Sequence, residues 1–142
     1  MSKITAYGIC LYKKEIDSIE ILLCKSVNSQ NRWGFLKGVS LENESKEETA
    51  LREFTEESNI KVNNILLEEF FYQKNDLKDI GIYLVNYTNV ENVDSYFDNE
   101  DLKEENICKE NSEVKFFPLE ELPLIKKKQV HLCKEVIDFL KS

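Results

Sequence analysis

The sequence predicts a single α/β domain in which strands lie on both sides of one central helix and a second helix closes the chain. The first observation is the order of the segments, because β-branched and aromatic runs flank residues 45–57, whose apolar residues recur at helical spacing. The second is the length of 142 residues, which suits one hydrophobic core and is too short for two. The third is the composition, with 42 % hydrophobic residues, two prolines and four glycines. We therefore expect residues 1–142 to fold as one domain.

Three strands are predicted before the central helix. Residues 4–12 and 19–25 are rich in β-branched and aromatic side chains. The polar residues 13–18 between them indicate a hairpin turn. Residues 32–36 predict a short third strand that leads into the loop before the helix.

Three further strands are predicted after the helix. Residues 60–73 and 80–87 have strand character, and the polar segment 74–79 indicates a turn between them. Residues 114–117 predict a last strand, which Pro118 stops.

Two helices are predicted with clear boundaries. Ser45 and Glu48 form a capping box, and Asn59 supplies a stop, so we expect a helix from Ser45 to about Glu57. Its apolar stripe consists of Ala50, Leu51 and Phe54. The closing helix is indicated by apolar residues at helical spacing, namely Val130, Cys133, Val136, Ile137 and Leu140.

The negative charge of the chain is concentrated in one segment. Residues 91–113 contain nine acidic and two basic residues, a local net charge of −7 out of −8 for the chain. We expect this segment to form a long loop with a short helix at about 101–106. The sequence lacks the basic stripe of a protein that binds long nucleic acid, so a small phosphorylated ligand, its charge screened by metal, is the expected partner.

The cysteines and the hydropathy pattern indicate a cytoplasmic protein. The four cysteines lie far apart without a C-x-x-C pair, and three occur in apolar stretches, as reduced thiols in a core do. Zinc binding and disulfide formation are the less favoured alternatives. No apolar run approaches the length of a membrane span and no signal-peptide pattern opens the chain, so no membrane association is expected.

Three carboxylates near the end of the central helix are the most informative feature for function. Glu53, Glu56 and Glu57 lie three and four residues apart and therefore share one helical face. Like charges at this spacing repel, and a helix C-terminus disfavours negative charge. A bound divalent cation, which takes clustered carboxylate oxygens as ligands, is the simplest reason for this arrangement; a solvated acidic helix is the alternative.

Residues 38–60 resemble the Nudix box, G-x5-E-x7-R-E-U-x-E-E-x-G-U with U apolar. The fixed positions are matched by Gly38, Glu44, Arg52, Glu53, Glu56, Glu57 and the apolar Phe54 and Ile60. Asn59 replaces the last glycine, and Asn is the residue after Gly that best tolerates a left-handed conformation. The resemblance is sharp over residues 33–60 and implies an α/β/α sandwich with a mixed central sheet.

The resemblance also implies roles for the residues of the box. Nudix hydrolases hold Mg²⁺ or Mn²⁺ and cleave a diphosphate linkage in a nucleoside diphosphate joined to another group. Carried onto this chain, the metal ligands are Glu53, Glu56 and Glu57, joined by a backbone carbonyl near Gly38. Arg52 is expected to brace the carboxylates together with Glu44, although an ordinary surface ion pair is the alternative.

Other site residues are predicted from position alone. Many family members place another Glu outside the box as a ligand or general base, and Glu110 and Glu113, which precede the last strand, are the candidates. Lys25, Arg32 and Lys37 are candidates for contact with substrate phosphates. Each of these charged side chains is by itself more often solvated.

The remaining aromatic and basic residues are more often structural or solvated than functional. The aromatic candidates for stacking on a base are Tyr7, Trp33, Phe35, Tyr72 and Tyr83, although most aromatics in strands belong to a core. Lys126 to Lys128 are expected to form a solvated basic face. The only histidine, His131, is expected to lie on the surface of the closing helix.

The resemblance allows several substrates. They are a dinucleoside polyphosphate, a noncanonical nucleoside triphosphate and a nucleotide sugar such as ADP-ribose. The general likeness of the chain to family members, including the FFPLEEL segment, favours the first two. Removal of pyrophosphate from RNA 5′ ends is an enzymatic alternative. A nucleotide-binding regulator without turnover is another, but such a protein is expected to lose box carboxylates, and this chain keeps them.

Overall fold

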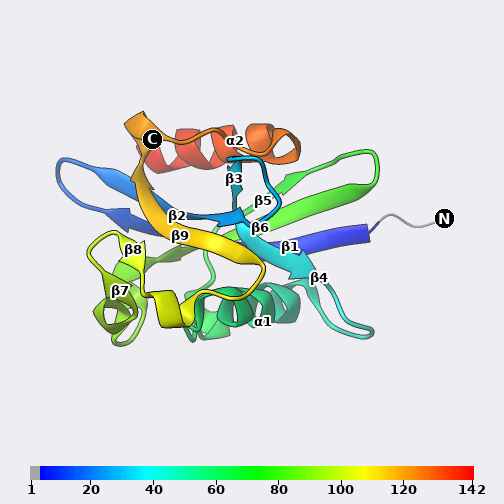
Figure 1. The fold of residues 1–142 in the computed structure, drawn as a ribbon. Coiled ribbons are helices and arrows are strands. Elements are labelled where there is room, and N and C mark those ends of the chain that lie inside the picture. The colour runs from blue at the N-terminus through cyan, green and yellow to red at the C-terminus, as the bar shows by residue number, and fades with distance from the viewer. Residues whose placement is uncertain (1–3) are drawn as a thin grey trace.

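The computed structural model describes residues 4–142, which form one mixed, nine-stranded sheet between two helices (Figure 1). The strands are β1 Ile4–Lys14, β2 Ile19–Ser26, β3 Trp33–Gly34, β4 Leu36–Val39, β5 Phe70–Gln73, β6 Lys78–Asn86, β7 Phe97–Asp98, β8 Asp101–Leu102 and β9 Asn111–Pro118. The helices are α1 Lys46–Ser58 and α2 Val130–Lys141. Short 3₁₀ turns cover Asn64–Leu66, Tyr87–Asn89, Val93–Tyr96, Glu104–Asn106, Leu119–Glu121 and Lys127–Gln129.

The strand order brings distant parts of the chain together. The order is β5-β6-β1-β2-β9-β8-β7, with β3 paired to β2 and β4 paired to β1. β1 and β6 are parallel, whereas the other named strand pairs are antiparallel. β1 changes partners along its length, because its first half pairs with β4 and its last residues pair with β2. This change places the loop before α1 beside the centre of the sheet.

The expected α/β/α sandwich is confirmed by the two cores on opposite faces of the sheet. In Figure 1, α1 covers one face and α2 covers the other. Alternate residues of a strand point to opposite faces, so Ile9 and Leu11 of β1 belong to the core under α1, while Cys10 belongs to the core under α2. Phe54 of α1 and Leu132 of α2 are fully buried in their respective cores.

The predicted boundaries of α1 are confirmed by the hydrogen bonds at its ends. The backbone N–H of Glu48 donates to Ser45 Oγ (3.1 Å), and the backbone N–H of Ser45 donates to Glu48 Oε1 (2.9 Å). Asn59 follows the helix in the left-handed conformation, with φ 65°, and its N–H donates to the carbonyl of Thr55 (2.8 Å). The capping residues therefore set where the helix presents its acidic face.

Two of the predicted strands are wrong in extent. Of residues 60–73, only Phe70–Gln73 is a strand, because Asn63 Oδ1 accepts from the N–H of Ile65 (3.1 Å) and starts a 3₁₀ turn. Residues 32–36 are also not one strand. The N–H of Phe35 donates to Gln129 Oε1 (2.8 Å) rather than to a neighbouring strand, so β3 and β4 are separate.

The acidic segment 91–113 is more structured than a loop. It contains β7 and β8, and the predicted helix near 101–106 is only the 3₁₀ turn at Glu104–Asn106. Phe97 and Leu102 anchor the segment because their side chains are buried in the core under α1. The acidic residues around these two anchors are exposed, which is why charge alone suggested a loop.

The cysteines behave as the sequence indicated. Cys10, Cys24 and Cys133 are buried, Cys108 is partly buried, and all are free thiols in the described chain. Within residues 4–142, the helices fall short of the length and apolar character that a membrane span requires.

The left-handed conformation of Asn59 gives a stability prediction. Asn59→Gly is expected to change the free energy of unfolding by less than about 0.5 kcal/mol, because Gly enters this conformation without strain. Asn59→Val is expected to lose about 1 kcal/mol or more, since a β-branched residue is strained there. Urea unfolding of both variants measures the difference. Equal stabilities would contradict the assignment of Asn59 as the residue that ends α1.

Candidate active site

Gly38 of β4 brings the loop into direct contact with α1. A Cβ atom at this position would lie 2.0 Å from the carboxyl carbon of Glu53. No side chain other than hydrogen fits at this distance, so the close approach of the loop to α1 requires glycine at position 38. The backbone of the loop and the Glu53 carboxylate are therefore adjacent.

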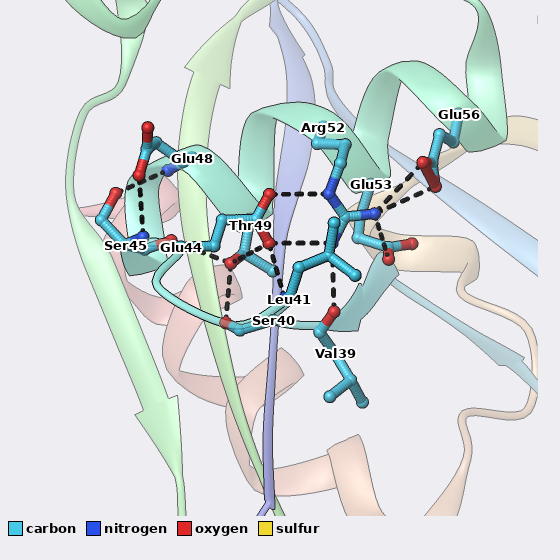
Figure 2. Close-up of polar contacts among 10 residues, drawn as sticks. All are labelled: Val39, Ser40, Leu41, Glu44, Ser45, Glu48, Thr49, Arg52, Glu53 and Glu56. Carbon is cyan, nitrogen blue, oxygen red and sulfur yellow. Dashed lines mark hydrogen bonds and ion pairs between the residues drawn. The ribbon is translucent and has the colours of Figure 1, made fainter.

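Arg52 connects three carboxylates and the loop (Figure 2). Its Nε and Nη2 donate to the two carboxylate oxygens of Glu44 at 2.7 and 2.9 Å. Its Nη1 donates to Glu53 Oε2 at 2.9 Å and to Glu56 Oε1 at 3.1 Å, and Nη2 also donates to the carbonyl of Val39 at 3.1 Å. The guanidinium thus lies where the sequence placed a brace, and it offsets the repulsion among the acids.

Glu44 is the most strongly held partner of Arg52. Its Oε1 also accepts from the N–H of Leu41 (2.9 Å) and from Thr49 Oγ1 (2.9 Å). The hydrogen bond from Arg52, followed by that from Leu41, lowers the pKa of Glu44 to about 2. Glu44 therefore remains ionised and orients Arg52, while its own oxygens are already occupied.

Glu57 lies outside this network and in a different electrostatic environment. Burial, together with the nearby charges of Glu53 and Glu110, raises the pKa of Glu57 to about 8. The hydrogen bond from Asn111 Nδ2 (3.4 Å) and the charge of Lys37 act in the opposite direction. A partly buried carboxyl group beside other carboxylates is a group that a bound cation would stabilise.

A cavity of about 370 Å³ joins these groups. Its lining includes the acids Glu53, Glu56, Glu57 and Glu110. Among residues 4–142, no group of three His, Cys, Asp or Glu side chains is placed so that it could hold a metal ion as it stands. Glu53 and Glu56 are instead bonded to Arg52. The donor set still fits a hard divalent cation, because these ligands are carboxylate oxygens. They gather where the backbone at Gly38 passes so close to Glu53 that a Cβ would collide with it.

The two candidates outside the box have different surroundings. Glu110 lines the acidic cavity, as its position suggested. Glu113 does not line it, and its Oε2 is 2.9 Å from Lys25 Nζ. This ion pair also removes Lys25 from the cavity, and Lys25 Nζ lies over the Trp33 ring at 5.6 Å from its centroid.

Two of the predicted phosphate-binding residues line cavities. Lys37 lines both the acidic cavity and a neighbouring one, whereas Arg32 lines only the neighbouring cavity and donates from Nη1 to the carbonyl of Ile125 (2.9 Å). Burial lowers the pKa of Lys37, and the charges of Lys126 and Lys78 lower it further. These three lysines therefore lie close together beside the carboxylates.

The aromatic candidates are mostly core residues. Trp33, Phe35 and Tyr83 are each less than 8 % exposed. Tyr7 is partly buried against the core under α1. Tyr72 is 38 % exposed, and its hydroxyl donates to Asp79 Oδ2 (2.8 Å).

Several residues of the cavity were not found from the sequence. They include Asn111, Lys78 and Lys126, although Lys78 was expected in a turn and Lys126 in a solvated face. Lys127, Lys128 and His131 are exposed, as expected. The missed residues belong to strands and segments that tertiary pairing brings to Gly38, so no local pattern identifies them.

Comparison with known proteins identifies the family. The profile described as NUDIX domain matches residues 2–136. A comparison with curated proteins finds no match. Among solved structures, C. elegans Ap4A hydrolase in a binary complex is 21 % identical with TM-score 0.61, covering 97 % of this chain and 93 % of that one. The NUDIX domain of Shewanella oneidensis NrtR complexed with ADP ribose is 18 % identical with TM-score 0.68, covering 99 % and 90 %.

A third similar structure matches along nearly its whole length. The MutT protein from Methanosarcina mazei Go1 is 18 % identical with TM-score 0.62, covering 100 % of this chain and 99 % of that one. At these identities the structures establish the shared fold, while the profile establishes the family.

The buried carboxyl group of Glu57 gives a pH prediction. Since its folded pKa is about 8, above the usual value, the unfolded chain loses this proton first, and metal-free stability should fall as pH rises from about 4.5 to 8. Glu57→Gln cannot ionise, so its stability advantage over the unmodified protein should grow by up to about 1.4 kcal/mol per pH unit in that window.

Chemical unfolding in EDTA at several pH values measures this difference. Glu135→Gln, which removes an exposed carboxylate from α2, is the matched control and should show no such trend. An advantage of Glu57→Gln that is the same at pH 5 and pH 8 would contradict the raised pKa.

Proposed function

The chain belongs to the NUDIX domain family and is a hydrolase acting on phosphoric anhydride bonds, and from that membership we propose that it cleaves a diphosphate linkage in a nucleotide with the help of Mg²⁺ or Mn²⁺. The observation that carries this proposal is the cavity in which four carboxylates meet the loop at Gly38. We further propose that residues 1–142 act as one domain.

Glu53, Glu56, Glu57 and the carbonyl of Gly38 are the proposed metal ligands. When bound, the metal neutralises the diphosphate and lowers the pKa of a bound water. Arg52 keeps Glu53 and Glu56 on the cavity side of α1, and Glu44 keeps Arg52 in place. Support comes from the hard oxygen donors and from the carboxyl group of Glu57, which lacks the stabilisation that a cation would supply.

Glu110 is the proposed proton acceptor for the attacking water. Its carboxylate faces the same cavity as the three box acids but comes from the loop before β9. Glu113 is a weaker candidate because it is paired with Lys25. A general base must lie within reach of the water that it deprotonates, and the place of Glu110 in the cavity lining supports this role.

Substrate phosphates are proposed to contact Lys37, Lys78 and Lys126. These cations line the same cavity as the carboxylates, so positive charge is available there for a bound diphosphate. Lys37 was predicted for this role, whereas Arg32 and Lys25 have other contacts. Arg32 remains near enough to line the adjoining cavity.

A dinucleoside polyphosphate or a nucleoside triphosphate is the favoured substrate. One similar structure is an Ap4A hydrolase and another was solved with ADP ribose, so both classes belong in the test. Pyrophosphate removal from RNA 5′ ends is a second candidate. The lysines that line the second cavity form a basic surface, although they come from distant parts of the sequence. A regulator without turnover is disfavoured by the complete set of box acids.

The expected setting is the cytoplasm, with small nucleotides as partners. This proposal is supported by the four free thiols, three of them buried. Neither long nucleic acid nor a membrane is a proposed partner.

Hydrolysis should require a divalent metal and the Glu53 carboxylate. Phosphate or nucleotide release from Ap4A, nucleoside triphosphates, ADP-ribose and 5′-triphosphate RNA is measured with Mg²⁺ and with EDTA. We expect activity on at least one nucleotide with Mg²⁺, none with EDTA, and a fall of about 10²-fold or more in kcat for Glu53→Gln. Full activity in EDTA after metal stripping would contradict the proposal.

A further inference from the structure

A second cavity, of about 620 Å³, adjoins the active-site cavity. Ser26, Lys37, Lys78 and Lys126 line both cavities, so the two are continuous. Beyond the shared residues, the second cavity is lined by Arg32, Lys127 and Lys128. Among its described lining residues, six are cationic and none is acidic.

This concentration of positive charge is notable in a chain whose net charge is −8. Like charges that face one another repel, and partial burial of Lys37 increases the cost of placing other lysines beside it. An anion between them would remove this repulsion. The cavity is therefore the electrostatic counterpart of the neighbouring carboxylate cluster, which a cation would stabilise.

The lysine run 126–128 is held in place by its backbone and is not a free tail. The N–H of Lys126 donates to the carbonyl of Trp33 (2.9 Å), and the N–H of Trp33 donates to the carbonyl of Leu124 (2.8 Å). Gln129 Oε1 accepts from the N–H of Phe35 (2.8 Å), and Asn75 Nδ2 donates to the carbonyl of Lys128 (3.2 Å). These hydrogen bonds fix the backbone of the lysine run along the rim of the cavity.

The lining also limits what kind of ligand the second cavity takes. Its described residues include no aromatic ring on which a base could stack, and Ile80 is its one apolar residue. The remaining lining side chains are amides and hydroxyls, such as Asn28, Ser29 and Gln30. Cationic groups, amides and hydroxyls suit phosphate oxygens better than a nucleobase or a sugar.

We propose that this second cavity binds the phosphates beyond the attacked linkage, so that the substrate carries a phosphate chain longer than a diphosphate. The inference rests on the proposed function, which supplies the attacked linkage. The diphosphate of a nucleotide sugar carries about two negative charges, which one divalent cation neutralises. Such a substrate would place no negative charge in the basic second cavity. Each additional phosphate adds about one negative charge opposite Arg32 and the lysine run.

The test uses Lys127→Ala/Lys128→Ala, which removes two charges that line only the second cavity. Lys134→Ala/Lys141→Ala removes the same charge from exposed positions of α2 and is the matched control. Lys127→Arg/Lys128→Arg keeps the charge. Calorimetric titration of the metal-free proteins with inorganic tripolyphosphate at low salt measures binding without catalysis.

We expect Lys127→Ala/Lys128→Ala to weaken tripolyphosphate binding roughly tenfold, with the control and the arginine variant unchanged. With Mg²⁺, the ratio of kcat/KM for Ap4A to that for ADP-ribose should fall to a similar extent, through KM rather than kcat. Equal tripolyphosphate affinity in the alanine variant and the control would overturn the inference.

The two proposals fail in different ways. If the unmodified protein hydrolyses no nucleotide, yet tripolyphosphate binding is lost only in the alanine variant, the proposed function is wrong and the anion site stands. In the other case, nucleotides are hydrolysed but the ratio of kcat/KM for Ap4A to that for ADP-ribose is the same in the alanine variant and the control. The proposed function then stands, and the second cavity does not select long phosphate chains.

Discussion

The site depends on the contacts of one guanidinium group. Arg52 bonds Glu44 in the loop before α1, Glu53 and Glu56 on α1 itself, and the carbonyl of Val39 at the end of β4. It therefore ties the loop to the helix and also offsets the repulsion among acids that face one another near a helix C-terminus. The absence of a side chain at Gly38 completes this contact, because any Cβ would displace the Glu53 carboxyl group.

The molecule separates charge over a short distance. Four carboxylates line one cavity, and six cationic side chains line the next, with Lys37, Lys78 and Lys126 shared between them. The parallel pairing of β1 with β6 brings Lys78 to this point, and the backbone bonds of Trp33 bring Lys126. A metal-bound polyphosphate has the complementary arrangement, with a cation at one end and uncompensated phosphates at the other.

Sequence reasoning succeeded where the determinants are local. The capping box at Ser45, the left-handed Asn59 and the shared face of Glu53, Glu56 and Glu57 depend on residues within a few positions, so α1 and its acidic face were predictable. The second cavity depends on contacts between residues nearly one hundred positions apart, such as Arg32 with Ile125. Such contacts leave no local pattern, and the lysine run 126–128 therefore suggested only a solvated surface.

The most direct test of the account is the binding of Mn²⁺ to a protein in which the brace is weakened. Mn²⁺ affinity, followed by the loss of the free-ion electron paramagnetic resonance signal, is compared for the unmodified protein, Glu44→Gln and the control Glu42→Gln, whose side chain is exposed in the same loop. If Glu44 acts through Arg52 on the metal ligands, Glu44→Gln should weaken Mn²⁺ binding about 10- to 100-fold, as loss of a partner behind the ligands does. Glu42→Gln should bind like the unmodified protein. Equal Mn²⁺ affinity in all three proteins would contradict the central role of the Arg52 network.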